Sequence, residues 1–402
     1  MSKVFIVGQG YVGLTVAKFA AEKSSVIGFD SNQKLVDQLN SGISHIEGIS
    51  SESLSGLIKR GAYRASTIGQ DLADCDIVVI AVPTPLKDDR TPDLRHIEAA
   101  CKTIATYATK PMLIINESTS YPGTVRGLIK PIIESLSEKK FEHLYSISPE
   151  RVDPGRLDWD QKNTPRLYAG LTPEAAVKTR DFYSTFCENL VEVSSPEVAE
   201  AAKLFENSFR QVNIALVNEL AQISHALGIS VRETLDAADT KPYGFMKFSP
   251  SAGVGGHCIP VDPSYLAHVA KGLGVPATFI ERANLVNLEM PKYIVKRVIA
   301  DNGGSIAGKK VQVIGVSYKS NIADTRETPA EILIENLKEA GAIVTWHDPL
   351  VGHWNGAEST ALGGSDIAIV VTKHDQISED LIKSSAPYVF DTTGKVSAVS
   401  GL

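Results

Sequence analysis

The stretch Val4-Phe5-Ile6-Val7-Gly8-Gln9-Gly10-Tyr11-Val12-Gly13 decides the fold of this chain. Its four leading apolar residues predict a buried strand, and its three glycines have the spacing that joins a strand to a helix in dinucleotide-binding folds. Gly8 permits a tight turn, Gly10 lets the backbone approach a pyrophosphate, and Gly13 allows close packing of the helix. The stretch therefore predicts the first strand, turn and helix of a βαβ unit.

An acidic residue strengthens this interpretation. Asp30 ends a second predicted strand, Ser25–Asp30, and a carboxylate at this place accepts hydrogen bonds from the ribose hydroxyls. It would repel a 2′-phosphate, so we predict NAD rather than NADP, bound by Gly8, Gly10, Tyr11, Val12, Gly13 and Asp30. The alternative is a doubly wound fold that has kept the glycines without the function.

Further apolar runs alternate with helical segments, which predicts parallel sheets covered by helices on both faces. After the first two strands, the predicted strands are 76–82, 112–115 and 144–147, then 310–316, 343–346, 367–371 and 388–390. The second series has a glycine after its first strand but no second GxGxxG pattern. We predict an α/β protein with two Rossmann-like doubly wound domains joined by a long central helix.

The central helix is predicted from its ends. Ser194-Ser195-Pro196-Glu197 has the composition of a helix start, no strong breaker follows before Leu227, and Gly228 is a good stop. Such a helix would be roughly 45 Å long, which suits a spine between domains and a homodimer surface. The alternative is two shorter helices with a bend. We expect domains at 1–194 (NAD-binding), 195–300 (helical, dimer-forming) and 301–402 (Rossmann-like, without the dinucleotide signature).

Composition narrows the classes of partner. The 402 residues are 43% hydrophobic and 22% charged, with a formal net charge of −7, which does not favour nucleic acid or an acidic membrane surface. Apolar runs are strand-sized, so no membrane span is expected. The four cysteines form no CxxC pair, so we expect no metal, and so few cysteines suit a reducing compartment. We expect a cytoplasmic protein.

One cysteine has unusual neighbours. The run Gly253-Val254-Gly255-Gly256-His257-Cys258-Ile259-Pro260-Val261-Asp262-Pro263 places Cys258 among glycines that give backbone freedom and room for a ligand. Asp262-Pro263 has the pattern of a helix start, and a helix N-terminus and His257 would favour a thiolate. From these neighbours alone Cys258 is equally well explained as a nucleophile or as a small buried residue. Cys75, Cys101 and Cys187 fit the second explanation.

Other candidates are weaker when each is taken alone. Lys203 and Asn207 share a helix face, which would suit an oxyanion, but spacing alone favours a solvated face. Glu150 follows a predicted strand and is either a general base or a surface acid. Thr119 and the Pro83-Thr84 pair also follow strands, at the edge where α/β folds bind ligands.

Taken together, these segments resemble the UDP-sugar 6-dehydrogenases, the UDP-glucose/GDP-mannose dehydrogenase family. The resemblance covers nearly the whole chain and rests on seven motifs in order: Gly8–Gly13, Val82–Pro85, Glu117–Thr124, Ser148–Gly155, the Lys203/Asn207 helix, Gly253–Pro263 and Tyr318–Pro329. It implies an N-terminal NAD domain, a C-terminal UDP domain and a dimer-forming helix between them.

The resemblance also implies residue roles. Cys258 would be the nucleophile, Lys203 and Asn207 would stabilise oxyanions, Asp262 would orient Lys203, and Glu150 with Thr119 would activate the hydrolytic water. Pro83, Thr84, Thr119 and Arg326 would contact the cofactor. The UDP-sugar would be bound by Glu150, Arg151, Val152, Lys203, Asn207, Phe248, Ser249, Gly253, Gly255 and Lys319.

The expected reaction is an NAD-dependent, four-electron oxidation of a sugar C6 alcohol to the acid, through a thiohemiacetal and a thioester on Cys258. Thr240–Phe245 and the motif around Cys258 resemble the branch acting on UDP-N-acetylhexosamines, with UDP-N-acetylglucosamine as the first expectation. Pro154 stands where UDP-glucose enzymes place a second glutamate. UDP-N-acetylmannosamine and UDP-glucose remain alternatives. A one-step NAD alcohol dehydrogenase and a non-enzymatic NAD- or UDP-sugar-binding protein are alternatives of another class.

Overall fold

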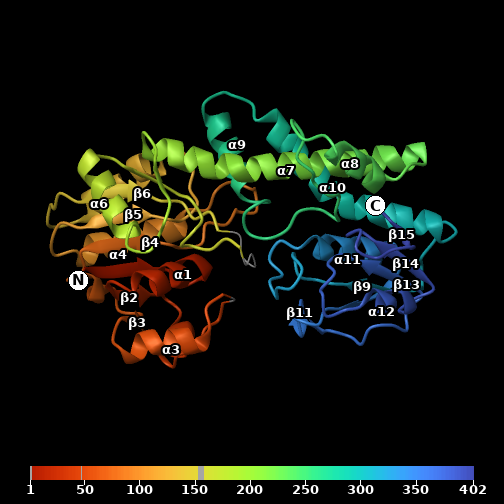
Figure 1. The fold of residues 1–402 in the computed structure, drawn as a ribbon, viewed down its shortest axis with the longest axis horizontal. Helices are drawn as coiled ribbons and strands as arrows, with labels where there is room; N and C mark the ends of the chain where they lie inside the picture. Colours follow the sequence, from red (N-terminus) through yellow and green to blue (C-terminus); the bar gives the residue numbers. More distant parts are fainter. Residues whose placement is uncertain (1, 47, 153–157) are drawn as a thin grey trace. The chain divides into compact units, whose positions relative to one another are not determined.

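A computed structural model describes residues 2–46, 48–152 and 158–402. The chain forms two compact units. The first, here called the N-terminal unit, comprises Met1–Glu206 and His268–Leu273; the second, the C-terminal unit, comprises Asn207–Ala267 and Gly274–Leu402. Figure 1 shows the course of the chain through both. Each unit contains its own sheet, as the two series of predicted strands require.

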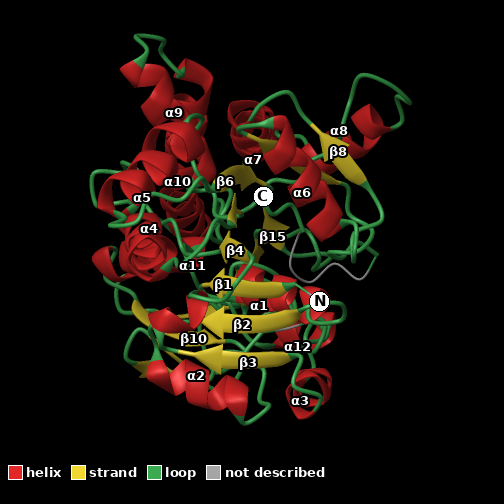
Figure 2. Cartoon of the chain, turned by 90° about the vertical axis from the view of Figure 1, so that its left-hand side faces the viewer, coloured by secondary structure: helices red, strands yellow, loops and turns green. Residues whose placement is uncertain are grey.

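The N-terminal unit contains an eight-stranded sheet in the order β3-β2-β1-β4-β5-β6-β7-β8. All neighbours pair in parallel except β6 and β7, which are antiparallel. Figure 2 shows β1, β2 and β3 side by side with their arrowheads pointing the same way. The strands are β1 (Lys3–Val7), β2 (Ser25–Phe29), β3 (Tyr63–Ser66), β4 (Ile77–Ile80), β5 (Leu113–Asn116), β6 (Leu144–Ile147), β7 (Arg166–Gly170) and β8 (Leu190–Glu192).

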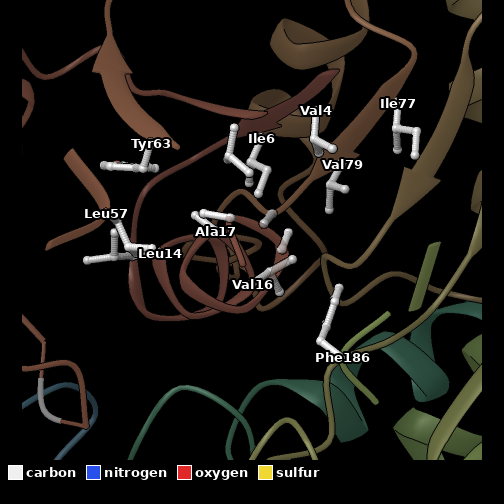
Figure 3. Packing of buried hydrophobic residues seen from close by; sticks show 14 of the residues in the cluster. Val4, Ile6, Leu14, Val16, Ala17, Leu57, Tyr63, Ile77, Val79 and Phe186 are labelled. Atoms are coloured by element: carbon white, nitrogen blue, oxygen red, sulfur yellow. The ribbon is translucent and has the colours of Figure 1, made fainter. Parts of the chain in front are cut away.

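Helices cover this sheet because its strands are apolar on both faces. Figure 3 shows Val4, Ile6 and Val79 of the sheet directed toward Val16 and Ala17 of α1, and all five are buried. The helical segments of the unit are α1 (Tyr11–Ala20), α2 (Gln33–Asn40), α3 (Ser51–Lys59), η1 (Gly69–Leu72), α4 (Arg95–Tyr107), η2 (Val125–Ile129), α5 (Lys130–Leu136) and α6 (Pro173–Tyr183).

The C-terminal unit contains a five-stranded parallel sheet in the order β10-β9-β13-β14-β15 and a separate two-stranded hairpin. The strands are β9 (Lys310–Ile314), β10 (Ile343–His347), β13 (Ile367–Val370), β14 (Tyr388–Asp391) and β15 (Ser400–Gly401), with β11 (His353–Trp354) and β12 (Ala357–Glu358) in the hairpin. Its helices are α8 (Val231–Asp239), α10 (Thr278–Asp301), α11 (Pro329–Glu339) and α12 (Glu379–Ser384), while α9 (Asp262–Gly272) belongs partly to each unit.

The long central helix is confirmed. Helix α7 runs without a break over Pro196–Leu227, which is 32 residues and about 48 Å. The Ser195 hydroxyl accepts a hydrogen bond from the Val198 amide at its start, and Gly228 adopts a φ of +68° at its end. The alternative of two shorter helices is therefore wrong.

The two sheets begin with the same turn. Gly8 after β1 has a φ of +92° and its amide donates to Phe29 at 2.8 Å, and Gly315 after β9 has a φ of +81° and donates to His347 at 2.8 Å. The next amide donates to the acid that ends the second strand: Gln9 to Asp30 and Val316 to Asp348, both at 2.9 Å. The halves of the chain thus repeat one local structure. Among the described residues, no helix has both the length and the apolar character that a bilayer span requires.

Candidate active site

The glycine turn of the N-terminal unit has the geometry of a dinucleotide cradle. A side chain on Gly8 would place its Cβ 2.4 Å from the Ala81 carbonyl oxygen, and one on Gly13 would place it 1.9 Å from the Gly8 carbonyl oxygen. A Cβ on Gly10 would meet nothing within 4 Å, so this position leaves open space at the N-terminus of α1. Tyr11 and Val12 form the first turn of this helix. The turn therefore fits a pyrophosphate approaching the backbone.

Asp30 lies beside this turn, at the carboxyl end of β2. One carboxylate oxygen accepts the Gln9 amide and the other accepts the Asn32 amide, each at 2.9 Å, and the side chain remains partly exposed. The two backbone bonds fix its orientation. A partly exposed carboxylate at this point fits the ribose of NAD.

Two predicted loops meet at the carboxyl ends of neighbouring strands β4 and β5. The Ser118 hydroxyl accepts a hydrogen bond from the Val82 amide at 2.8 Å, which links the loop that contains Pro83 and Thr84 to the loop that contains Thr119. Pro83 is exposed, Thr84 is buried and Thr119 is partly buried. The structure thus places these three predicted cofactor contacts together at one sheet edge.

Glu150 follows β6 and its carboxylate is held on both oxygens. The first oxygen accepts the backbone amides of Arg151 and Val152, each at 2.6 Å. The second accepts Arg166 Nη2 at 3.1 Å and the side-chain amide of Gln161. Residues 153–155 of the predicted motif, including Pro154, lie outside the described residues. Glu150 is consequently fixed in one orientation by its own unit.

The charges around Glu150 keep it ionised. Burial by itself would raise the pKa of Glu150, but the positive charge of Arg166, the hydrogen bonds from Gln161 and the Val152 amide, and the charge of Lys203 lower it. Lys203 projects from α7, so the structure brings this predicted residue within electrostatic range of Glu150. Arg151 is held by an ion pair of 2.7 Å with Glu206, which also lies on α7.

In the C-terminal unit, Asn207 and Asp262 contact one another directly. The Asn207 side-chain amide donates to the Asp262 carboxylate at 2.6 Å, and both residues are buried. Asn207 lies on α7. Asp262 is the first residue of α9, whereas the sequence predicted that Asp262 caps the helix and that the helix begins at Pro263. Asn207 is thus not on a solvated helix face.

Cys258 is exposed, and it precedes α9 by one turn. Its carbonyl oxygen accepts the amides of Val261 and Asp262, at 3.2 and 2.8 Å, which ties the cysteine to the helix start. The other three cysteines are buried, as expected, and burial raises the pKa of each thiol: to about 11 for Cys75 and Cys187 and to about 12 for Cys101. Cys258 therefore differs from them in accessibility.

The glycines around Cys258 have a role that the sequence interpretation missed. A Cβ on Gly255 would lie 2.7 Å from Tyr318 Cβ, one on Gly256 would lie 2.7 Å from the Tyr318 ring, and one on Gly253 would lie 3.0 Å from the Asn287 carbonyl oxygen. The space at these positions is taken by the chain itself rather than left for a ligand. The glycines let the cysteine loop pack against the Tyr318–Pro329 motif.

Arg326 supplies the positive charge near Cys258. Its hydrogen bonds to Asp324 raise the pKa of Arg326 first, and the Cys258 sulfur contributes in the same direction, so the two groups interact electrostatically. Burial, and then the charge of Arg326, lowers the pKa of His257, which leaves this imidazole neutral at pH 7. Arg326 is thus a charged group that interacts with Cys258, whereas burial and Arg326 disfavour the charged form of His257. The pairing with Asp324 is bidentate, at 3.0 and 2.5 Å.

The remaining predicted substrate residues lie on the same unit. Phe248 packs edge-on against Phe209 of α7, with ring centroids 5.9 Å apart, while Ser249 is exposed. Lys319 is partly buried, and its carbonyl accepts the Ser317 hydroxyl at 3.1 Å. Each unit therefore gathers its own set: the glycine turn, Asp30, Thr119, Glu150 and Lys203 in one, and Asn207, Cys258, Asp262, Lys319 and Arg326 in the other.

Two buried acids were missed by the sequence interpretation. Glu117 forms an ion pair of 3.1 Å with Arg166, and burial raises the pKa of Glu117 to about 7. Glu200 on α7 accepts the amides of Gly123 and Val125, at 2.6 and 3.2 Å, and burial raises its pKa to about 7 as well. Glu117 is the first residue of the predicted motif Glu117–Thr124, and Glu200 lies on α7 three positions before Lys203, but nothing local in the sequence marks either acid as buried.

The fold and these two sets of residues define an NAD-binding α/β oxidoreductase. Family models for the UDP-glucose/GDP-mannose dehydrogenases match the chain in three parts: the NAD binding domain over residues 2–187, the central domain over 197–289 and the UDP binding domain over 312–398. The chain belongs to the UDP-glucose/GDP-mannose dehydrogenase family. It is an NAD-dependent nucleotide-sugar dehydrogenase.

Relatives of this chain include two named enzymes. The UDP-N-acetyl-D-glucosamine 6-dehydrogenase of Pseudomonas aeruginosa is 35% identical over 87% of this chain and 83% of its own length. The UDP-N-acetyl-D-mannosamine dehydrogenase of Methanococcus maripaludis is 32% identical over 98% and 92%. A solved structure of the UDP-D-ManNAc dehydrogenase from Pyrococcus horikoshii matches 99% of this chain and 98% of that one, with a TM-score of 0.89 and 28% identity.

Proposed function

We propose that the chain oxidises the C6 alcohol of UDP-N-acetylglucosamine to the carboxylate, through a covalent adduct on Cys258. The exposed position of Cys258 at the start of α9 is the observation that carries the proposal. An accessible sulfur beside a helix N-terminus and the Arg326 charge suits a thiolate nucleophile. Relatives named for UDP-N-acetylhexosamines support the sugar class.

The proposed reaction consists of two oxidations at the sugar C6 carbon followed by hydrolysis of a thioester. The residues of the glycine turn, Gly8–Gly13, would hold NAD, and two NAD molecules bound in succession would supply the two hydride acceptors that the reaction needs. In the first step the C6 hydroxyl loses a proton and its carbon loses a hydride, which gives an aldehyde. The Cys258 thiolate adds to this carbon, the carbonyl oxygen takes up a proton, and a thiohemiacetal forms. Loss of the second hydride from the carbon and of a proton from its hydroxyl leaves a thioester on Cys258, from which water releases the acid and the thiolate.

Lys203 and Asn207 take the role of oxyanion stabilisers in this scheme. Their amine and amide supply donors where negative charge develops on oxygen. The Asp262 carboxylate orients the Asn207 amide through the contact of 2.6 Å. The further expectation that Asp262 orients Lys203 stays a prediction. Glu150, held ionised by Arg166, is proposed to hold the hydrolytic water together with Thr119.

Replacing the nucleophile tests the covalent scheme. Cys258→Ser, incubated with NAD and the UDP-sugar, is expected to lose acid production while it still binds NAD. Cys101→Ser, at a buried cysteine of the N-terminal unit, is the matched control and should keep turning over. Full acid production by Cys258→Ser would remove the scheme. Counting NADH gives a second test, because two NADH per sugar are required and a one-step alcohol dehydrogenase would give one.

A panel of sugars tests the substrate. Initial rates of NADH formation should be compared for UDP-N-acetylglucosamine, UDP-N-acetylmannosamine, UDP-N-acetylgalactosamine and UDP-glucose. The proposal requires the highest kcat/KM for the first of these. A higher kcat/KM for UDP-N-acetylmannosamine would leave the proposed reaction intact and would show that the substrate is UDP-N-acetylmannosamine instead.

The proposal includes a homodimer formed through α7. Phe209, Leu216, Ile223 and Leu227 lie along this helix and are exposed, although all are large and apolar. Such a stripe is typical of a protein–protein interface. Leu216→Glu is expected to yield monomers in sedimentation analysis, and a variant that stays dimeric would contradict this surface. The three-domain division at 194 and 300 stays part of the proposal.

A further inference from the structure

A buried arginine lies behind Glu150 and holds it from one side. Arg166 is the first residue of β7, and 4% of its side chain is exposed. Its guanidinium contacts Glu150 and Glu117, each at 3.1 Å, and Nη1 also donates to the Ser148 hydroxyl at 3.1 Å. A planar fork of donors suits two such carboxylates at fixed angles.

Neutral groups complete the enclosure of this arginine. The Gln161 side chain accepts from Arg166 and donates to Glu150, so it bridges the two. The guanidinium carbon lies 4.5 Å from the centre of the Tyr183 ring, and the Tyr183 hydroxyl donates to Glu117. Gln161, Tyr183 and Ser148 are all buried. A guanidinium held on so many sides has little freedom to change its orientation.

The two carboxyl groups that contact Arg166 have pKa values that are shifted in opposite directions. Burial raises the pKa of Glu117 to about 7, although Arg166 opposes this effect. At Glu150 the charge of Arg166 and the Gln161 and Val152 hydrogen bonds outweigh burial and lower the pKa. The charged and titratable groups that face this cluster are Glu117, Glu150, Arg166, Tyr183, Cys187 and Lys203. Arg166 therefore keeps the Glu150 side of the cluster ionised.

We propose that Arg166 is a positioning residue for the release of the acid, because it fixes the orientation of the Glu150 carboxylate. This inference rests on the proposed function, in which Glu150 serves the hydrolysis of the thioester. In that step the water oxygen forms a bond to the acyl carbon, its proton passes to Glu150, and the carbon–sulfur bond breaks to return the Cys258 thiolate. Arg166 touches none of the reacting atoms and acts only through Glu150.

A substitution that keeps the charge but removes the fork tests the role. Arg166→Lys is expected to lower kcat about tenfold to a hundredfold, the usual cost of misplacing a catalytic group by about 1 Å. Both hydride transfers precede hydrolysis, so a slow last step should appear as a burst of about two NADH per chain followed by a slow phase. Acid quenching during the slow phase should then trap the acyl group on Cys258, visible in the intact protein mass. The dissociation constant for NAD, measured by titration without the sugar, should change by less than about twofold, because Arg166 does not touch the glycine turn.

Two further variants make the experiment decisive. Arg180→Lys is the control, since Arg180 pairs with Asp181 on the surface of the same unit, and it should behave as the wild type. Ser148→Ala removes the hydroxyl contact to Arg166 together with the hydrogen bond from that hydroxyl to the Leu167 carbonyl at 2.9 Å. It should give a smaller burst of the same kind, which keeps the test valid if Arg166→Lys fails to fold.

The outcomes separate the inference from the proposed function. A folded Arg166→Lys or Ser148→Ala that loses kcat without a burst or an adduct would overturn the positioning role. If instead the wild type yields one NADH per sugar, or Cys258→Ala still makes acid, the covalent scheme itself fails. A burst with an adduct in Arg166→Lys, absent in Arg180→Lys, supports the inference.

Discussion

The side-chain amide of Asn207 lies 2.6 Å from the carboxylate of Asp262, and both residues are buried in the C-terminal unit. The bond joins α7 to the first turn of α9, one turn after Cys258. A buried carboxylate without a donor would be costly, so each residue fixes the other. The amide's remaining donor hydrogen is thereby oriented for another acceptor.

Placing a second acid in this contact should disable the enzyme. Asn207→Asp sets two carboxyl groups side by side, and one of them must take up a proton. We expect kcat to fall about a hundredfold or more and stability to fall by about 1–3 kcal/mol. Asn355→Asp is the matched control, because the Asn355 amide donates to Glu331 at 2.8 Å on the surface. Steady-state kinetics and thermal unfolding would measure both, and unchanged kcat in Asn207→Asp would contradict the assigned role.

Removing the charge beside the glycine turn should alter cofactor preference. Asp30→Asn loses the charge that binds ribose hydroxyls and repels a 2′-phosphate. We expect kcat/KM for NAD to fall about tenfold to a hundredfold and the preference over NADP to shrink by a similar factor. Asp37→Asn, at an acid of α2 that accepts from Gln33, is the control. A variant that prefers NAD over NADP as strongly as the wild type does would show that Asp30 does not contact the ribose hydroxyls.

Adding one methyl group to the cysteine loop should impair sugar turnover alone. Gly255→Ala would place a Cβ 2.7 Å from Tyr318 Cβ and 2.9 Å from the Glu327 carbonyl oxygen. The loop must move, so we expect kcat/KM for the UDP-sugar to fall about tenfold or more while NAD affinity is unchanged. Gly272→Ala in α9 meets nothing within 4 Å and should be neutral. Equal losses in both variants would contradict the packing role.

Glu200 should make the protein less stable as the pH rises. The pKa of Glu200 is about 7 in the folded protein, above its ordinary value of 4.5, because it is buried. Between pH 4.5 and 7 the folded state binds more protons, so this group's contribution to stability is present below pH 4.5 and is lost as the pH rises through 7. In Glu200→Gln this loss is absent, so the Tm of the variant relative to wild type should rise from pH 5 to pH 8.

A neighbouring acid supplies the contrast for this measurement. The hydrogen bond from Arg126 lowers the pKa of Glu197, so its contribution is present above the ordinary pKa and is lost only as the pH falls below it. Glu197→Gln should therefore show a constant Tm difference between pH 5 and 8. If Glu200→Gln behaves in the same way, the raised pKa of Glu200 is wrong.

The local sequence pattern of apolar runs and helix-end residues was sufficient to predict much of the fold. The apolar runs predicted β1, β4, β6 and β13 because strands covered on both faces are continuously apolar, and the ends of α7 were marked by Ser195 and Gly228. Strands β7 and β8 were not predicted, since Arg166 opens the first and exposed residues make up most of the second. A charged residue in a strand becomes intelligible only when its distant partners are known.

The candidate site shows the same limit. Cys258 was singled out by its neighbours, but whether Gly255 makes room for a ligand or for Tyr318 depends on a segment more than sixty residues away. Glu117 and Arg166 are 49 positions apart and meet only through the pairing of β5, β6 and β7. Asp348 was within reach of sequence reasoning, because it ends its strand as Asp30 does.

The repeated turn has a consequence for the order of events in the reaction. Asp348 is buried and its oxygens are occupied by the amides of Val316, Ser317, Leu350 and Val351 and by the ring of His374, whereas Asp30 is partly exposed. At the turn that follows β9, the Asp348 carboxylate is thus occupied by the protein itself and is not available to bind a ribose. In the proposed reaction, both oxidations therefore use the coenzyme site at the Gly8 turn, and the reduced coenzyme must leave before a second oxidised coenzyme binds. The proposed aldehyde intermediate must remain on the enzyme during this exchange, and a covalent bond to the Cys258 sulfur would retain it.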